Sequence, residues 1–516
     1  MKANLVPMIL LAALSFSTGC SSSAGSRTTA PVPPPSKELT SAVGSTNSPI
    51  PQVNPNLLLK RRVLDLLQQE KFFQLNALLE SFQQDFDKDF RKEMVLEEAF
   101  DAFSAYDPAM ENRLHKWVHQ SPHSYSALLA RAYYFKSRAW ASRGTRWAKD
   151  TSSTQFAHME LNLGKASEDV VSALKLKGEL IVGFDLLISI EMASPTSGSD
   201  LPLVERALAN WPNSFLIRKA YMHRLKPRWG GSYRKMQSFA DAAQTYAQAN
   251  PRLKFLHGFI YVDQGQMLAN DERFEQAIEA HTQALSYGDY WQFRHERADT
   301  YFRMKNYPAA LEDVNRAIEL YPQGVENYVL RSKILFEMGR FADGIGDLGI
   351  ARQIWPYEDA VQEWVRSAAV DLVYAGHQLY GQNEYSTALE RYNMAETCDP
   401  SHSDIYYWRG VLFMRQGSLA EAQQDLEKAA QLNPRHFESY RSLDWVLAKQ
   451  GKWDAVIEHW NRFLALQPNH AKAYLERGGT FLHKGDLKRA FQDAQKACQL
   501  GEEEACARSE TLKQRI

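Results

Sequence analysis

The chain has 516 residues, of which 44% are hydrophobic and 23% are charged, and its formal net charge is −1. Because 60 basic residues balance 61 acidic ones, the chain lacks the excess of positive charge that drives nucleic-acid binding. No apolar run reaches the roughly 18 residues that a membrane-spanning helix needs, and four cysteines are too few for a disulfide scaffold of this length.

Residues 1–19 have the pattern of a secretory signal peptide. Lys2 precedes an apolar stretch over residues 5–16, and small residues then lead to Cys20. This pattern resembles the lipobox of bacterial lipoproteins, in which that cysteine becomes the lipidated N-terminus. The resemblance implies a lipid anchor on the periplasmic face of a bacterial membrane, and Ser21 implies the outer membrane. An ordinary cleaved signal peptide is the alternative.

The segment 20–56 is predicted to be a disordered tether. It consists mostly of Ser, Thr, Ala and Pro and has almost no large apolar side chains, so burial cannot offset the entropy that is lost when it orders. A proline-rich ligand for an aromatic groove is the alternative interpretation.

Residues 57–257 are predicted to form a helical domain. Leucine and phenylalanine recur at helical spacing near its start, and Pro122 and Pro212 each end a helical segment. The region resembles an uncharacterised bacterial domain family, and this resemblance implies no activity.

Candidate catalytic groups in this domain are sparse. His115, His119 and His123 have the spacing that aligns metal ligands on a helix, but Pro122 interrupts that helix and no acidic partner completes a zinc site. Phosphate-binding and nucleophile-elbow motifs are missing. We therefore expect no enzymatic activity, no metal and no cofactor. An unrecognised active site in residues 57–257 is the alternative, and it would bring titratable groups together near His115, His158, Glu160 or Arg228.

Residues 258–501 repeat with a period of about 34 residues. Small side chains allow helix axes to approach each other, and proline ends a helix. The small residues are Ala277, Ala310, Gly344, Ala388, Ala422 and Ala490, and the prolines are Pro322, Pro356, Pro400, Pro434 and Pro468. The pattern resembles the tetratricopeptide repeat (TPR), in which each repeat is a pair of antiparallel helices.

The resemblance implies seven repeats, at about 258–290, 291–324, 325–358, 369–402, 403–436, 437–470 and 471–501. About ten extra residues around 357–366 keep a helical pattern and predict longer helices before the fourth repeat. Val456 and Phe463 put bulk into the sixth repeat, which predicts a wider helix crossing. Residues 502–516 are predicted to form a capping helix. The predicted fold class is all-α, an α-α superhelix preceded by a helical, partly repeat-like domain.

Two cysteines flank the end of the last repeat. Cys498 and Cys506 resemble the cysteine pairs of cysteine-rich αα-repeat proteins, which implies a disulfide between them, and a secreted destination permits one. Two buried thiols are the alternative. Cys398 is expected to be buried.

The two halves of the chain differ in charge. Residues 57–257 hold 28 basic and 22 acidic side chains, whereas residues 258–516 hold 29 basic and 38 acidic ones. The acidic repeats are therefore expected either to attract cationic partners or to dock onto the chain's own basic half.

The repeat resemblance also implies a binding groove. In the family, positions 2, 5, 9 and 12 of each first helix face the concave side, and here they hold His295, Asp299, Phe302, Lys333, Phe336, His377, Tyr380, Tyr407, Met414, Arg441 and Trp445. The family's clamp for a C-terminal carboxylate, Lys at position 5 with Asn at position 9, is missing. The aromatic side chains predict that the groove holds an extended or helical protein segment. Packing of some of these rings against the N-terminal half is the alternative.

The function expected from these features is that of a lipid-anchored periplasmic adaptor or scaffold, which binds a protein or peptide in an assembly or secretion system of the cell envelope. The membrane is expected to be a partner through the lipid anchor alone. An enzyme with its active site in residues 57–257, or a structural envelope protein, is the alternative.

Overall fold

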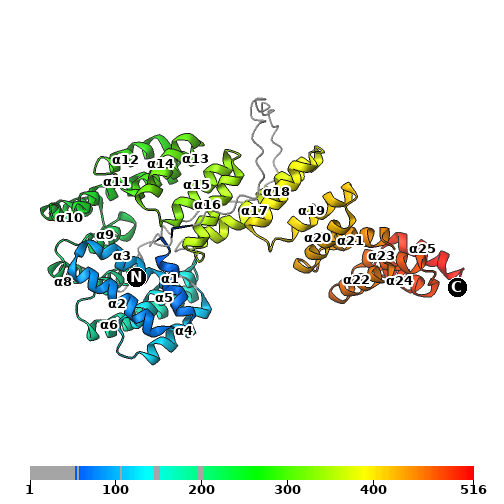
Figure 1. Cartoon of the computed structure of the whole chain (residues 1–516), viewed down its shortest axis with the longest axis horizontal. Coiled ribbons are helices and arrows are strands. Elements are labelled where there is room, and N and C mark those ends of the chain that lie inside the picture. The colour runs from blue at the N-terminus through cyan, green and yellow to red at the C-terminus, as the bar shows by residue number, and fades with distance from the viewer. Residues whose placement is uncertain (1–52, 55–56, 105–106, 145–150, 194–200) are drawn as a thin grey trace, which may run out of the picture. The chain divides into compact units, whose positions relative to one another are not determined.

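The computed structural model describes residues 53–516 apart from 55–56, 105–106, 145–150 and 194–200, so the predicted signal peptide, Cys20 and nearly all of the predicted tether lie outside the described residues. Within the described part of the chain, every regular element is a helix (Figure 1). The all-α prediction is therefore confirmed. The chain divides into two compact units, residues 1–361 (unit 1) and residues 362–516 (unit 2).

Unit 1 begins with the helices of the N-terminal half. Pro122 and Pro212 each stand two residues beyond a helix end, as predicted, and the side chains of Ser124, Ser152 and Ser214 cap the starts of three helices. The helices are α1 (Leu59–Gln68), α2 (Phe72–Lys88), α3 (Glu93–Asp101), α4 (Pro108–Gln120), α5 (Tyr125–Arg143), α6 (Ser153–Leu176), α7 (Ile181–Ala193), α8 (Leu201–Asn210), α9 (Phe215–Arg224) and α10 (Tyr233–Ala243).

The repeats follow as pairs of helices, each with a first and a second helix. The pairs are α11 (Phe255–Asn270) with α12 (Phe274–Leu285), α13 (Trp291–Arg303) with α14 (Tyr307–Leu320), α15 (Val325–Glu337) with α16 (Phe341–Ile354), α17 (Asp359–Gly381) with α18 (Tyr385–Cys398), α19 (Ser403–Gln416) with α20 (Leu419–Leu432), α21 (Phe437–Lys449) with α22 (Trp453–Leu466), and α23 (Ala471–His483) with α24 (Leu487–Gln499). The division between the two units falls within α17. This helix has 23 residues, whereas α15 and α21 have 13 each, which confirms the longer helix before the fourth repeat.

The glycines in the repeats mark places where two helices touch. A Cβ atom on Gly376 of α17 would lie 2.6 Å from the ring of Tyr392 in α18, and that ring is fully buried. A Cβ atom on Gly344 would lie 2.6 Å from the ring of Phe336. Any larger residue at these two positions would push the helices apart.

An arginine and an aspartate join the two helices in four of the repeats. In each pair the residues are 16 positions apart, and the guanidinium donates two hydrogen bonds of 2.6–3.0 Å to the carboxylate. The aspartate side chains are only 3–8% exposed. The pairs are Arg297–Asp313, Arg331–Asp347, Arg409–Asp425 and Arg477–Asp493. These bidentate contacts fix the two helices relative to each other.

The sixth repeat replaces that ion pair with a tryptophan. Trp460 is fully buried, together with Val456 and Phe463, and its indole Nε1 donates a 2.9 Å hydrogen bond to Asp444. The bulk that the sequence places in this repeat therefore lies in its core. The wider crossing of its helices stays a prediction.

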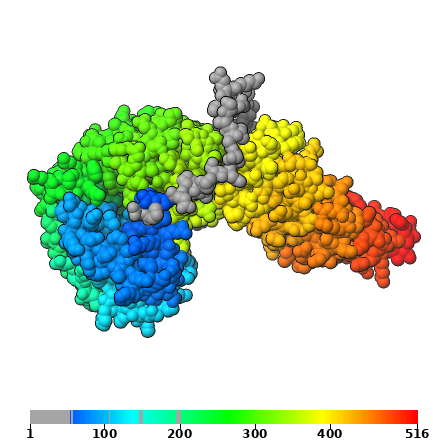
Figure 2. Space-filling model, in the orientation of Figure 1, coloured from blue at the N-terminus to red at the C-terminus, as the bar shows by residue number. Residues whose placement is uncertain are grey.

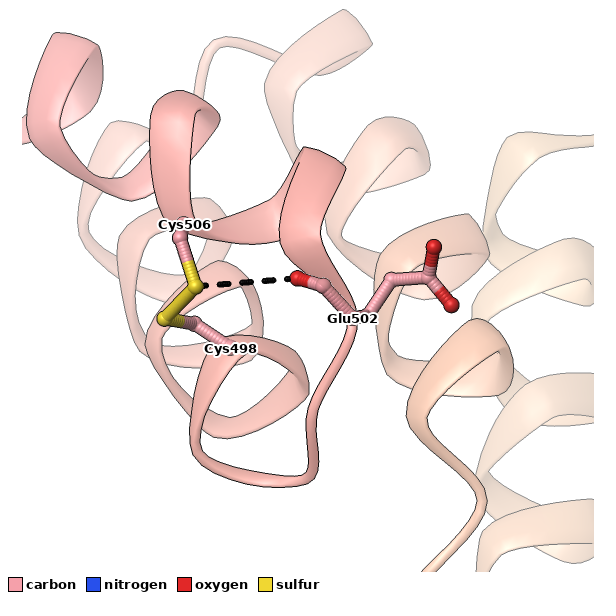
Figure 3. Close-up of a disulfide and its surroundings, with 3 residues drawn as sticks. All are labelled: Cys498, Glu502 and Cys506. Atoms are coloured by element: carbon pink, nitrogen blue, oxygen red, sulfur yellow. Dashed lines mark hydrogen bonds between the residues drawn. A yellow bond between two sulfur atoms is a disulfide. The ribbon is translucent and has the colours of Figure 1, made fainter.

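A disulfide closes the C-terminal end of unit 2. Cys498 of α24 is bonded to Cys506 of α25 (Glu503–Lys513), with their Cα atoms 4.7 Å apart (Figure 3). The bond joins the last repeat to the helix that packs on it, and this helix occupies the region predicted to form a cap. Cys398 is buried.

The N-terminal helices of unit 1 pack against its second and third repeats. Gln68 of α1 donates a 2.8 Å hydrogen bond to the hydroxyl of Tyr357, and Gln323 donates a 3.2 Å hydrogen bond to Glu98 of α3. The ammonium of Lys60 lies 5.3 Å from the ring centre of Trp355. Figure 2 shows the surface of unit 1, in which the blue N-terminal helices adjoin the green repeats. Segments that are far apart in the sequence thus enclose the interior of unit 1.

Candidate functional site

Five of the eleven predicted groove residues lie on α13 and α15, in unit 1. His295 and Phe336 are each only 7% exposed. The imidazole Nδ1 of His295 lies 2.8 Å from the side-chain oxygen of Asn327, and the Phe336 ring packs edge-to-face on Phe341 with their centres 5.3 Å apart. Both side chains therefore belong to the helix packing. Asp299, Phe302 and Lys333 are half-buried.

The concave side of the first three repeats faces the chain's own N-terminal half. Position 2 of each repeat holds Phe259, Gln292 and Glu326, and these side chains line cavities shared with α3 and α9. The sequence left open whether the acidic repeats attract other molecules or dock onto the basic residues 57–257. The first three repeats dock onto residues 57–257.

The other six predicted residues lie in unit 2, on the first helices α17, α19 and α21. His377, Arg441 and Trp445 are exposed, and Trp445 retains 44% of its surface. Tyr380, Tyr407 and Met414 are half-buried.

Side chains of successive first helices touch one another in unit 2. The ring centres of His377 and Trp408 are 4.0 Å apart, and those of Tyr407 and His436, which directly precedes α21, are 5.0 Å apart. The Arg441 guanidinium lies 3.9 Å from the carboxylate of Glu476 in α23. The first helices of repeats four to seven therefore share a continuous lining.

Three further residues of this lining were not among the eleven predicted, although Val370 occupies position 2 of the fourth repeat. Val370 and Tyr374 of α17 are 48% and 63% exposed, and their spacing from His377 places all three on one face of the helix. Trp408 follows Tyr407 directly. It occupies position 6 of its repeat, which is not one of the positions that face the concave side in the family. We call Tyr374, His377, Tyr407, Trp408 and Trp445 the aromatic row.

Charges border the aromatic row. Burial raises the pKa of the Tyr407 phenol, and the nearby Glu438 carboxylate raises it further. Burial also raises the pKa of Glu476, while Arg441 acts in the opposite direction. Apolar rings with acidic and basic neighbours are suited to bind a segment that has both apolar and charged side chains.

The groups that an active site in residues 57–257 would use do not share one environment. His115 of α4 lies beside Glu111 and Arg131, and His158 and Glu160 are exposed on α6. Arg228 instead forms an ion pair with the buried Asp263, which also accepts a 3.1 Å hydrogen bond from Tyr233. In the described residues, no three His, Cys, Asp or Glu side chains are arranged to hold a metal ion. No described helix is both long enough and apolar enough to cross a bilayer.

Family models match both halves of the chain. A domain of unknown function, DUF4034, matches residues 60–194, and TPR models match residues 262–325, 376–417, 403–436 and 445–505. The first of these matches places a DUF4034 domain before the repeats.

Similar proteins are found among curated sequences and solved structures. Anaphase-promoting complex subunit 3 of Schizosaccharomyces pombe is 27% identical over 132 residues, and the Hsp70-Hsp90 organizing protein of Triticum aestivum is 22% identical over 206 residues. The alignments cover 26% and 40% of this chain but only 20% and 34% of those relatives. The crystal structure of the APC/C hetero-tetramer Cut9-Hcn1 aligns with 88% of this chain and 95% of its own, at 13% identity and a TM-score of 0.25.

Proposed function

We propose that this chain, which carries TPR repeats behind an N-terminal DUF4034 domain, is a non-catalytic adaptor of the bacterial cell envelope. TPR repeats mediate protein–protein interactions. The observation that carries the proposal is the aromatic row of unit 2, in which Tyr374 and Trp445 are 63% and 44% exposed. Exposed aromatic side chains at neighbouring positions are typical of the energetic centre of a binding surface.

The chemistry of the row suggests what it binds. Its rings offer apolar pockets, while Glu438, Arg441 and Glu476 offer charged edges. A helical or extended segment with apolar side chains on one face and charged ones at its border fits both features. The partner is therefore proposed to be such a segment of another envelope protein, in an assembly or secretion system.

Truncating side chains of the aromatic row is expected to weaken binding of the partner protein strongly. In the triple variant Tyr374→Ala/Tyr407→Ala/Trp445→Ala, retention of partners from solubilised envelopes by residues 57–516 should fall by at least roughly tenfold, because a few aromatic residues carry most of the energy of such surfaces. The measurement is a quantitative pull-down with circular dichroism to check helicity.

The matched control changes three exposed apolar residues outside the row. Phe73, Met338 and Leu466 are 87%, 38% and 49% exposed, and the variant Phe73→Ala/Met338→Ala/Leu466→Ala should retain what the parent retains. Equal retention by the row variant and the parent would move the binding surface elsewhere on the chain.

Lipid anchoring is the second part of the proposal. Cys20, which lies outside the described residues, is expected to incorporate labelled palmitate and to hold the chain in the outer-membrane fraction, since several buried acyl chains give a lasting anchor. The variant Cys20→Ser should carry no label and should move to the soluble fraction. Unlabelled parent chain in the soluble fraction would point to an ordinary signal peptide.

A further inference from the structure

Unit 1 contains two adjoining pockets of about 240 Å³ and 610 Å³, both partly open to solvent. Met94, Glu97 and Lys219 line both cavities, so we treat the two as one space and call it the chamber. Helices α3, α5, α7, α9 and α11 line its smaller part, and α1, α3, α13 and residues 355–358 help to line its larger part.

Carboxylates outnumber cations in the chamber. Several lining charges already have partners of opposite sign: Lys60 with Asp101, Lys226 with Asp263, and Asp289 with Arg294 and Arg316. The lining charges without such partners are the carboxylates of Glu97, Glu98, Asp185, Glu326 and Glu358, the ammonium groups of Lys136 and Lys219, and the guanidinium of Arg252. The chamber thus has two more carboxylates than cations, and the excess lies in its larger part.

Asp185 lies in the smaller part of the chamber, which Lys136, Lys219 and Lys226 also line. Its residue on α7 is only 8% exposed, its side chain lines the smaller part of the chamber, and it accepts no hydrogen bond from any described residue. Lys136 and Lys219 act on it through space, without an ion pair. A carboxylate that has lost most of its contact with water is stabilised by a cation beside it.

Aromatic side chains face the same space. The rings of Trp291 and Tyr321 are stacked, with their centres 4.8 Å apart, and both line the larger part of the chamber beside Trp355. The Lys60 ammonium already lies 5.3 Å from the Trp355 ring centre and pairs with Asp101. Carboxylates and aromatic faces together are the groups that recognise organic cations.

We propose that the chamber is a binding site for an organic cation, a primary ammonium or guanidinium group that reaches the carboxylates of Glu97 and Asp185. The group belongs either to a small amine or to a Lys or Arg side chain of a peptide. This site is separate from the aromatic row, so the proposal stands independently of the adaptor function.

Proton binding in the chamber agrees with this assignment. Burial raises the pKa of Glu97 to about 8, and the Asp101 and Asp185 carboxylates raise it while Lys219 and Lys60 oppose them. Burial raises the pKa of Glu358 to about 7, with Glu326 and Asp101 in the same direction and Lys60 against it. Protons therefore take up the excess negative charge near neutral pH. A bound cation would displace these protons, so its affinity should rise between pH 6 and pH 8.

The test is calorimetric titration of the full chain in detergent at pH 6 and pH 8. The probes are spermidine, arginine and the peptide Gly-Lys-Gly, with glutamate as the anionic comparison. At least one cation should bind, should bind at least about tenfold more tightly at pH 8 than at pH 6, and should release protons when buffers of different ionisation enthalpy are compared. Binding of spermidine or arginine would identify a small amine as the source, and binding of the peptide alone would identify a protein segment.

Two neutralising variants separate recognition from folding. Glu97→Gln/Asp185→Asn should weaken binding of the cation at pH 8 at least about tenfold without loss of helicity, since it removes charge and keeps shape. The control Asp65→Asn/Glu160→Gln changes two exposed carboxylates in the same way and should bind as the parent does. No binding of any cation, binding of glutamate as tight as that of the cations, or unchanged binding by the folded chamber variant would overturn the proposal.

Discussion

The variant Arg331→Met is expected to lower the free energy of unfolding of unit 1 by about 3–5 kcal/mol. Arg331 donates two hydrogen bonds of 2.7 Å to Asp347 and one of 2.9 Å to Asn315. The Asp347 side chain is only 6% exposed, and burial already raises its pKa while Arg331 counteracts this. Methionine fills similar space but leaves the buried carboxylate without its partner. Denaturant unfolding, followed by hydrogen exchange of α15 and α16, measures the loss.

Two comparisons isolate the ion pair. Arg340 forms an exposed pair with Asp343, with side chains 50% and 56% exposed, so Arg340→Met should cost less than about 1 kcal/mol. The double variant Arg331→Met/Asp347→Leu removes both charges and should recover most of the stability. If Arg331→Met and Arg340→Met unfold alike, the buried pair does not hold the two helices of this repeat together.

Raising the pH from 6.5 to 8 is expected to lower the melting temperature of unit 1 by several degrees. In the folded chain the pKa of Glu97 is raised to about 8 and that of Glu358 to about 7, whereas in the unfolded chain both lie near the ordinary value of about 4.3. The folded state therefore holds protons that the unfolded state has already lost. Stability is full below the unfolded pKa and is lost as pH rises through the folded one.

The pH range and the variants separate the effect of Glu97 and Glu358 on stability from the effects of other titrating groups. Burial lowers the pKa of His281 to about 4, which favours folding as pH rises toward 6.5, so the carboxylate effect is read above that value. The variant Glu97→Gln/Glu358→Gln should melt at a higher temperature than the parent at pH 8 and should show a flatter slope from pH 6.5. Thermal unfolding of Asp65→Asn/Glu160→Gln should follow the parent. Parallel slopes for the chamber variant and the parent would refute the raised pKa values.

The repeat architecture followed from the sequence because its interactions are local. Each helix pair spans about 34 residues, so small residues, prolines and the helical pattern of the extra segment before α17 report directly on neighbouring helices. The disulfide of Cys498 and Cys506, which the resemblance to cysteine-rich αα-repeat proteins implied, is also local, since it joins residues eight positions apart. The buried Arg–Asp pairs were equally local, at a constant separation of 16 residues, and a search for that spacing would have found them.

Exposure and the chamber, by contrast, depend on which distant segments meet. Position numbering assigned His295 and Phe336 to an open groove, but both are buried, because they pack against Asn327 and Phe341 on neighbouring repeat helices. The contact between Gln323 and Glu98 joins residues 225 positions apart. A pattern within a short stretch of sequence cannot predict such a contact. Whether a carboxylate such as Asp185 is solvated on a surface or unpaired in a cavity is decided by that packing, since burial sets both its pKa and its need for a partner.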